Sequence, residues 1–296
     1  MIEANRTKPV YPDVADMRHA APPTAAVFRN YFDAKSRHSV DATMKFFAPD
    51  LLTYTDSTWG WPVDGYGALK SLFDSYMPKW PASGLSYPVR VLGGPESALV
   101  EFIDTKELFG AELRLFGAVD FKDWKIVRWV DYWDSNTVDT ALDSQMRTPA
   151  AKFPTEYKDD AVGEHASGRI SDVVRRLHHA LSRNDATSAA SLFSYESMLE
   201  DRTMRTQIVG REAIDRYLAR AAAQLPYGSG TRVRHIVGGD LGGGYEWISS
   251  SSKATHGLTA LELNAAGHIT RASIIYDGRP IPISERVKLA VLALEP

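Results

Sequence analysis

Three side chains in the first half of the chain could take part in proton transfer: Tyr54, Asp104 and Asp131. An aspartate has an ordinary pKa of about 3.9, but removal from water can raise that pKa by up to roughly 3–5 units. A buried Asp131 would then be a general base that works near neutral pH. We expect Tyr54 to donate a hydrogen bond to an oxygen on which negative charge develops. Asp104 is expected to orient a water molecule or to share a proton with Asp131.

These residues belong to the first of two similar halves of the 296-residue chain. Leu92-Gly93-Gly94 returns as Val237-Gly238-Gly239, and Val100-Glu101-Phe102 returns as Tyr245-Glu246-Trp247, in both cases 145 positions later. Further matches keep the same order along the chain at nearly the same spacing. A colinear repeat of this kind indicates two copies of one domain.

The repeat serves as an internal control for the three polar residues. On a predicted strand, Asp131 shares a face with Trp129. Its counterpart is an isoleucine, so Asp131 is expected to point into a largely apolar space, where an unsatisfied carboxylate costs several kcal/mol. A scaffold that folds without these polar groups in its second copy does not need them in its first. The counterparts are Leu199 for Tyr54, Ser249 for Asp104 and Ile274 for Asp131.

Other acidic positions are kept in both copies, and we interpret them as caps, turn contacts or solvated residues. They are Asp56 with Asp201, Glu101 with Glu246, and Asp134 with Asp277. Structural alternatives stay open for the candidate residues as well. Asp131 could be an exposed residue at a strand end, Asp104 could begin the turn at 105–110, and Tyr54 could be a core tyrosine with a satisfied hydroxyl.

The apolar pattern predicts helices first and strands afterwards in each half. Val27, Phe28, Tyr31 and Phe32 recur at helical spacing, as do apolar residues over 170–181. Strands are predicted at 51–54, 87–92, 98–105, 112–121 and 125–133, with a turn-rich stretch at 59–65 and a helix over 69–76. This order predicts the α+β class: two tandem cone-shaped α+β barrels, in which helices pack on a curved, mostly antiparallel sheet.

The repeat and the composition of the connecting segments predict the domain boundaries. We expect an N-terminal arm at 1–23, a catalytic domain at 24–142, a polar linker at 143–168, a second, degenerate domain at 169–283 and a C-terminal tail at 284–296. The tail is expected to dock on the body. Gly242-Gly243-Gly244 is not followed by the Lys-Ser/Thr of a phosphate loop and is interpreted as a hairpin turn.

Composition excludes several classes of function. Lys and Arg number 34 against 37 Asp and Glu, so no broad cationic surface is expected to hold a nucleic acid. The absence of cysteine excludes disulfides, iron–sulfur clusters and a cysteine nucleophile. The histidines lack metal-ligand spacing, so neither a metal nor a cofactor is expected. No apolar run reaches the 18 residues of a membrane span, and no signal peptide is recognised, so the expected location is the cytoplasm.

Two motifs carry a resemblance to a known superfamily. Phe46-Phe47-Ala48-Pro49-Asp50 leading into Tyr54-Thr55-Asp56, and the strand Lys125–Asp134 with its Trp-Val-Asp-Tyr-Trp-Asp ending, resemble the nuclear-transport-factor-2-like proteins. Within that superfamily the chain resembles SnoaL-like polyketide cyclases and limonene-epoxide-hydrolase-like enzymes. The resemblance implies cones that each enclose a hydrophobic pocket. It also implies that the two cones pair through their sheets as an intramolecular pseudo-dimer; a homodimer is left open.

The epoxide-hydrolase pattern carries over only in part. Its Tyr-x-Asn resembles Tyr54-Thr55-Asp56, and its last catalytic aspartate resembles Asp131. Its Arg-x-Asp pair resembles Phe102-Ile103-Asp104, so the arginine that would lie between two carboxylates is missing. This difference argues against epoxide hydrolysis.

Aromatic residues near the predicted pocket favour a flat or polycyclic apolar ligand. Tryptophans are more often core residues than ligand platforms, but the second copy has smaller residues or a tyrosine at these positions. The expected substrate-binding residues are Asp56, Trp59, Trp61, Phe102, Trp129 and Trp133.

The expected function is that of a cofactor-free acid/base enzyme of the cyclase, isomerase or lyase type in the first domain. Its partner would be a small hydrophobic substrate, polyketide-like or terpenoid-like, and neither a nucleic acid nor a membrane. Two alternatives are kept: an epoxide hydrolase, and a protein that binds a hydrophobic ligand without catalysis.

Overall fold

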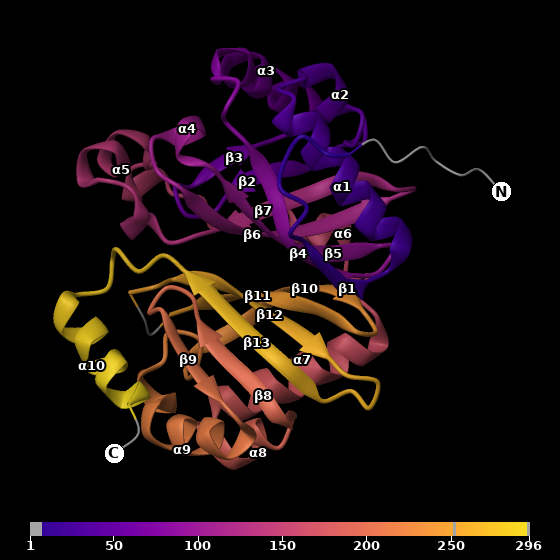
Figure 1. The fold of residues 1–296 in the computed structure, drawn as a ribbon. Coiled ribbons are helices and arrows are strands. Elements are labelled where there is room, and N and C mark those ends of the chain that lie inside the picture. The colour runs from indigo at the N-terminus through magenta and orange to yellow at the C-terminus, as the bar shows by residue number, and fades with distance from the viewer. Residues whose placement is uncertain (1–7, 251–252, 295–296) are drawn as a thin grey trace.

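Two curved sheets, each covered by helices on one face, make up this computed structural model, which describes residues 8–250 and 253–294 (Figure 1). Helices α1 to α3 cover the first sheet on one side of the molecule, and α7 to α9 cover the second sheet on the opposite side. The predicted α+β class with two tandem curved-sheet domains is confirmed. Residues 1–7 of the predicted arm and 295–296 of the predicted tail lie outside the described residues.

The first domain has its helices before and between its strands. Its helices are α1 (Pro22–Ser36), α2 (Val40–Met44), α3 (Tyr66–Tyr76), α4 (Lys106–Phe109) and α5 (Thr140–Met146). Its strands are β1 (Asp16–Ala20), β2 (Thr53–Asp56), β3 (Trp61–Val63), β4 (Ser86–Gly93), β5 (Ser97–Asp104), β6 (Leu113–Lys122) and β7 (Lys125–Tyr132).

The second domain repeats this order without a counterpart of β1. After the short α6 (Asp159–Val162), its helices are α7 (Gly168–Ser182), α8 (Ala186–Ala190), α9 (Arg211–Ala221) and α10 (Ile283–Ala293). Its strands are β8 (Phe193–Asp201), β9 (Thr206–Val209), β10 (Thr231–Gly239), β11 (Gly242–Ser249), β12 (His256–Leu263) and β13 (Ile269–Tyr276).

Strand order and register reproduce the sequence repeat. The sheets run β1-β4-β5-β6-β7-β2-β3 and β10-β11-β12-β13-β8-β9. β2 pairs in parallel with β7, where Asp56 lies opposite Asp131. β8 pairs in parallel with β13, where Asp201 lies opposite Ile274. The residues matched by sequence therefore occupy the same register positions in the two sheets.

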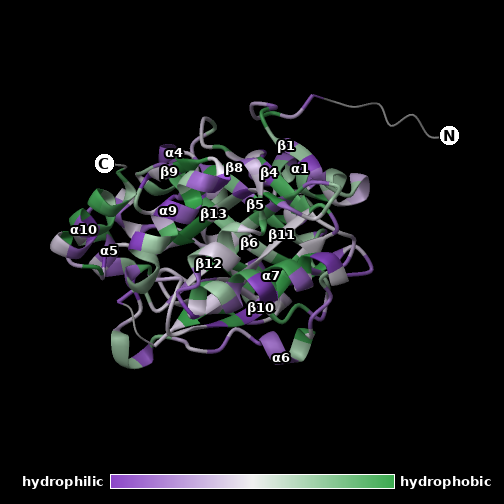
Figure 2. Ribbon diagram, turned by 90° about the horizontal axis from the view of Figure 1, so that it is seen from below, coloured by the Kyte–Doolittle hydropathy of each residue, from purple (hydrophilic) through white to green (hydrophobic). Residues whose placement is uncertain are grey.

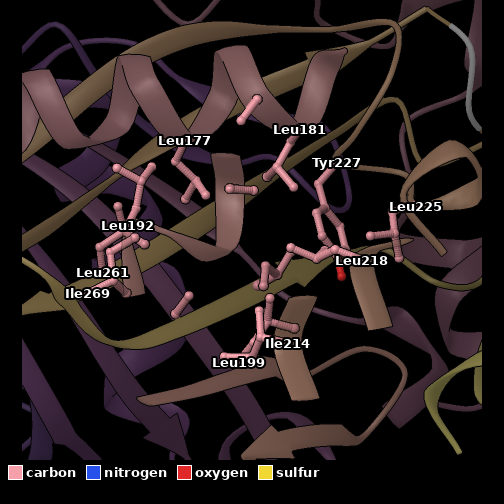
Figure 3. Packing of buried hydrophobic residues seen from close by; sticks show 14 of the residues in the cluster. Leu177, Leu181, Leu192, Leu199, Ile214, Leu218, Leu225, Tyr227, Leu261 and Ile269 are labelled. Carbon is pink, nitrogen blue, oxygen red and sulfur yellow. The ribbon is translucent and has the colours of Figure 1, made fainter. Parts of the chain in front are cut away.

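The long helices form because their apolar residues recur along one face. In α7 the buried residues Ile170, Val173, Val174, Leu177 and Leu181 follow the 3.6-residue period, and the Ser167 side chain caps the first turn. Along the outer helices hydrophilic and hydrophobic residues alternate, as expected for helices with one face on a sheet (Figure 2). Figure 3 shows Leu177 and Leu181 pointing from α7 into the apolar core of the second domain.

Several elements differ from the sequence predictions. The stretch 59–65 holds the short strand β3, which pairs with β2. The arm supplies β1, which pairs in parallel with β4. The predicted boundary at 142 falls inside α5. Gly242-Gly243-Gly244 is not a turn but the start of β11. A Cβ on Gly244 would collide with the Thr259 carbonyl of the neighbouring strand and would lie 2.9 Å from Leu99 of the first domain, so a larger residue does not fit there.

The two sheets pack against each other through the faces that point away from their own helices. This contact is an apolar layer that contains charged residues. Leu99, Phe116 and Val130 of the first sheet belong to one buried cluster with Leu258 and Ala260 of the second. Val130 comes from β7, whose neighbouring residues point to the opposite face of the sheet. Each sheet is therefore buried on both faces.

Arg128 is a fully enclosed cation in this seam between the sheets. Its side chain is fully buried, with Nη1 2.8 Å from Glu246 and 3.3 Å from Asp120, and with Nη2 paired to Asp159 of the linker. Burial alone would lower the pKa of Arg128, but these carboxylates raise it above its ordinary value. The cation thus offsets negative charge from both domains and the linker.

Replacing Arg128 with methionine should destabilise the chain by about 3–5 kcal/mol, because buried carboxylates lose the cation that offsets them. Urea denaturation measures the change in the free energy of unfolding. The matched control is Arg114→Met, which removes an exposed pair with Glu112 and should cost less than about 1 kcal/mol. Equal effects of the two substitutions would contradict the role given to Arg128.

Candidate functional site

Asp131 lies inside the first domain, on the face of β7 that points toward the helices. It is 3% exposed, and one carboxylate oxygen accepts a hydrogen bond from Trp129 Nε1 at 2.5 Å. The sequence prediction that Asp131 points inward agrees with this position. Asp131 is therefore not an exposed strand-end residue.

The surroundings of Asp131 favour its neutral form. Burial is the largest cause and raises its pKa to about 8. The hydrogen bond from Trp129 and the charge of Lys35 act in the opposite direction, whereas Asp56 and Asp104 raise the pKa further. At neutral pH most molecules carry a protonated Asp131, which can donate a proton, and the ionised fraction can accept one.

Lys35 and Asp104 form a second buried polar pair in the same interior. The Lys35 ammonium lies 3.3 Å and 3.5 Å from the two carboxylate oxygens of Asp104, and both side chains are about 5% exposed. The ammonium also lies 5.2 Å from the centre of the Phe102 ring. Asp104 is thus neither solvated nor a turn residue. It is the last residue of β5, and its side chain points into the interior of the domain.

Sequence reasoning missed Lys35, although a signal for it was present. Phe28, Tyr31 and Phe32 define the buried face of α1, and position 35 follows them at the spacing of the same face. A lysine on an apolar helix face needs a buried partner. Nothing in the pattern identifies Asp104 as that partner, since 69 residues separate the two.

Two tyrosine hydroxyls complete the cluster. The Tyr54 ring stacks on Trp129 with ring centres 5.6 Å apart. Burial raises the pKa of Tyr54 and of Tyr31, and the nearby charges of Asp131 and Asp104 raise both further. A hydrogen bond between the two hydroxyls lowers the pKa of Tyr31 and raises that of Tyr54, as expected when Tyr54 donates to Tyr31. Both hydroxyls therefore lie in the interior that holds Asp131 and Asp104.

The second domain lacks every charged or phenolic member of this cluster. Ser36-Arg37 matches Ser182-Arg183, which sets the correspondence for the helices. Together with the strand register, it shows that the second domain has uncharged, non-phenolic residues at all the matched positions. The counterparts are Leu177 for Tyr31, Leu181 for Lys35, Leu199 for Tyr54, Ser249 for Asp104, Ala272 for Trp129 and Ile274 for Asp131.

The remaining predicted binding residues do not converge on Asp131. Asp56 accepts hydrogen bonds from the Trp59 backbone at 2.9 Å and from Trp133 Nε1 at 3.0 Å. Its counterpart Asp201 accepts similar bonds, from the Met204 backbone and the Tyr276 hydroxyl, at 2.8 Å each. This agreement favours the interpretation of Asp56 as a turn contact rather than a substrate-binding residue.

The tryptophans outside the cluster secure the C-terminal segment of the first domain. Trp59 Nε1 donates to Asp143 at 3.0 Å, and Trp61 Nε1 donates to the Met146 carbonyl at 2.7 Å. Both acceptors belong to α5. The structure thus uses these indoles to hold α5 against the domain, whereas Phe102 and Trp129 pack in the interior beside Lys35 and Asp131.

The interior of the first domain is filled by aromatic rings. Trp129 packs against Tyr31, Phe32, Tyr54 and Phe102. None of the five cavities described for residues 8–250 and 253–294 is lined by Asp131, Asp104 or Lys35. A molecule that reaches Asp131 must therefore displace side chains.

The corresponding place in the second domain holds a small closed cavity. Its volume is about 10 Å³, at the lower limit for one water molecule, and its lining surface is apolar. Leu177, Leu181, Leu199, Ala272 and Ile274 line it, and these are the counterparts of the first domain's cluster. Tyr245 and Thr259 also border it, and a hydrogen bond with Thr259 counteracts the rise that burial causes in the pKa of Tyr245. The cavity remains because Ala272 stands where the first domain has an indole.

The described residues contain no group of three histidine or acidic side chains that could hold a metal ion. Over the same residues, every helix is too short or too polar to cross a bilayer.

Asp131 should make the stability of the chain fall as pH rises. Its pKa is about 8 in the folded state and about 3.9 in an unfolded chain, so unfolding releases a proton between these values. The carboxyl therefore contributes fully to stability below about pH 4 and progressively opposes folding up to about pH 8. Asp131→Asn should be more stable than the unchanged protein, and the gain should grow over this range when urea unfolding is measured at several pH values.

Asp50→Asn is the control for this pH series. Asp50 is exposed, and its hydrogen bond with Lys122 lowers its pKa, so the sign of its effect is opposite. A gain for Asp131→Asn that is independent of pH would show that the carboxyl is already ionised in the folded protein.

Comparison with known proteins finds similarity only among solved structures. No protein-family model matches the chain, and no curated protein matches it. A steroid delta-isomerase from Pseudomonas aeruginosa has 10% identity and a TM-score of 0.35, over 44% of this chain and 93% of its own. A SnoaL-like protein from Burkholderia thailandensis has 12% identity and a TM-score of 0.34, over 38% and 98%. An NTF-2-like protein from Burkholderia xenovorans has 15% identity and a TM-score of 0.31, over 37% and 83%. This chain is thus similar to structures described as NTF2-like and SnoaL-like.

Proposed function

We propose that the first domain is a cofactor-free acid/base enzyme of the isomerase, cyclase or lyase type, acting on a small, largely apolar molecule. The observation that carries the proposal is that the first domain buries a polar cluster at positions where the second domain has uncharged, non-phenolic residues. Lys35, Asp104 and Asp131 are costly to bury, and the second domain keeps the same fold with leucine, serine and isoleucine at those positions. Buried polar groups that cost free energy and that the fold does not need are typical of a functional site.

The chemistry follows from the charges in the cluster. Ionised Asp131 removes a proton from a carbon or hydroxyl of the substrate, and the Tyr54 or Tyr31 hydroxyl donates a hydrogen bond to the oxygen that gains negative charge. Lys35, held by Asp104, adds a positive charge to the same interior. Protonated Asp131 then returns the proton to another atom of the substrate. No group outside this chain is needed for these steps.

The walls of the interior set the expected class of substrate. Phe32, Phe102 and Trp129 surround the polar groups, so the molecule should be flat and apolar apart from one carbonyl or hydroxyl. Trp129 donates to Asp131 in the closed state, and substrate binding has to replace this hydrogen bond. A polyketide-like or terpenoid-like molecule meets these requirements.

Epoxide hydrolysis is the second candidate, and Lys35 is the observation that favours it. The related pattern places an arginine where this chain has Phe102. Here the Lys35 ammonium lies over the Phe102 ring and beside Asp104, and its charge also affects Asp131. A cation near both carboxylates is therefore supplied from α1 instead of β5. Binding without catalysis is the third candidate, which the apolar rings around Trp129 would also serve.

Two probe reactions separate the first two candidates. 5-Nitrobenzisoxazole opens when a base removes its ring proton, and its product keeps the mass of the substrate. Styrene oxide hydrolysed in ¹⁸O-labelled water gives a diol that carries one labelled oxygen. We expect turnover of the benzisoxazole to rise with pH around the pKa of Asp131, about 8, and to fall by about a hundredfold or more in Asp131→Asn.

Asp50→Asn and Ile274→Asn are the controls and should leave this rate unchanged, since one residue is exposed and the other lies in the second domain. Equal rates for Asp131→Asn and the unchanged protein would rule out Asp131 as the base. Labelled diol from styrene oxide, lost in Lys35→Met, would favour the epoxide hydrolase. Saturable binding of either probe without turnover would favour the binding protein.

A further inference from the structure

A cleft between the linker and the second domain lies apart from the candidate active site. Residues 147–157 form one wall, and the ends of β10 and β11 with residues 253–256 form the other. Its volume is about 540 Å³, within the range of roughly 300–1,000 Å³ that is usual for small-molecule sites. None of the cluster residues around Asp131 lines it.

Phe153 from the first wall and His256 from the second form a neutral aromatic pair in the cleft. The rings of Phe153 and His256 stack, with centres 5.9 Å apart and planes 28° apart. Burial lowers the pKa of His256 to about 4, so its ring is uncharged at neutral pH. His256 Nε2 then donates to the Ser57 carbonyl at 2.9 Å, which fixes the ring against the first domain. The pair of Phe153 and His256 rings therefore suits a flat apolar group.

The second wall of the cleft also carries unpaired positive charge. Arg232 and Lys253 are exposed, and neither forms an ion pair with any residue in the ranges that the structure describes. Arg147 and Asp277, which also line the cleft, neutralise each other at 2.7 Å. The remaining acidic side chain is the exposed Glu156, so cations exceed anions around this space.

Arg234 adds a fixed cation at the base of the cleft. Its side chain is only 6% exposed, and its guanidinium lies 4.2 Å from the centre of the Tyr157 ring. Its Nε is 3.4 Å from Asp159, and one terminal nitrogen donates to the Thr155 carbonyl. Its charge and a hydrogen bond to Tyr157 both lower the pKa of that hydroxyl, which burial raises. The guanidinium is thus held in place beside the cleft.

We propose that this cleft binds a small anion with a flat apolar body, such as an aryl carboxylate. The carboxylate would lie among Arg232, Lys253 and Arg234, and the ring system would lie against Phe153 and His256. This site is independent of the acid/base function proposed for the first domain, because the two share no residues. A ligand here would touch the linker and the second domain together.

Calorimetric titration of the full chain with 2-naphthoate tests the proposal, with 2-naphthylmethanol as its neutral analogue. We expect saturable binding of naphthoate and at least about threefold weaker binding of the alcohol. The double variant Arg232→Ala, Lys253→Ala should weaken naphthoate binding by about three- to tenfold, as expected for two partly exposed charges. Phe153→Ala should weaken the binding of both 2-naphthoate and 2-naphthylmethanol.

Lys45→Ala with Arg183→Ala removes two exposed cations elsewhere on the surface and should leave naphthoate binding unchanged. Asp131→Asn should also leave it unchanged, which separates this site from the first domain's interior. The proposal is overturned if naphthoate does not saturate, if the alcohol binds as tightly, or if the control pair weakens binding as much as the cleft pair. A loss of binding confined to Asp131→Asn would also overturn it.

Discussion

The burial of both faces of each sheet is the constraint on which the rest of the structure depends. A strand between two covered faces presents alternate residues to two different interiors. On β7, Arg128, Val130 and Tyr132 face the second domain, whereas Trp129 and Asp131, followed by Trp133 just after the strand, face the helices of their own domain. One strand therefore supplies the central cation of the seam and the central acid of the candidate site. The backbone separates the two, so each interior can keep its own charge balance.

The seam and the candidate site meet the cost of buried charge in different ways. At the seam, carboxylates of both domains and of the linker surround Arg128 and Arg90, and the pairs lie at hydrogen-bond distance. In the candidate site, Lys35 and Asp104 form one looser pair, and Asp131 has only an indole donor. Paired charges suit a permanent interface, since each group keeps its ionised state. A carboxyl with an incomplete set of partners remains able to exchange a proton.

Much of the architecture could be predicted from the sequence because it depends on local pattern and on repetition. Helical and strand periodicities predicted the α+β class, and the repeat predicted that Asp131 points inward and that Asp56 and Asp201 share one role. The strand β1 was not predicted, since its pairing with β4 depends on contacts more than 70 positions away. Lys35 was missed because a charged residue interrupts the apolar pattern that defines a buried face. The filling of the first interior depends on how the Trp129, Tyr54 and Phe102 rings pack, and periodicity does not determine ring directions.

The close packing of Trp129 on Gly117 restricts the order in which the two domains could have diverged. A Cβ at Gly117 would lie 2.8 Å from Trp129 Nε1, so any larger residue there collides with the indole. The second domain has Thr259 and Ala272 at these two positions, and both line its cavity. Starting from a glycine–tryptophan ancestor, a smaller residue had to replace the tryptophan before a larger one could replace the glycine. Starting from a threonine–alanine ancestor, the glycine had to come first. In either history the pair passed through a glycine–alanine intermediate, whose interior was emptier than that of either present domain.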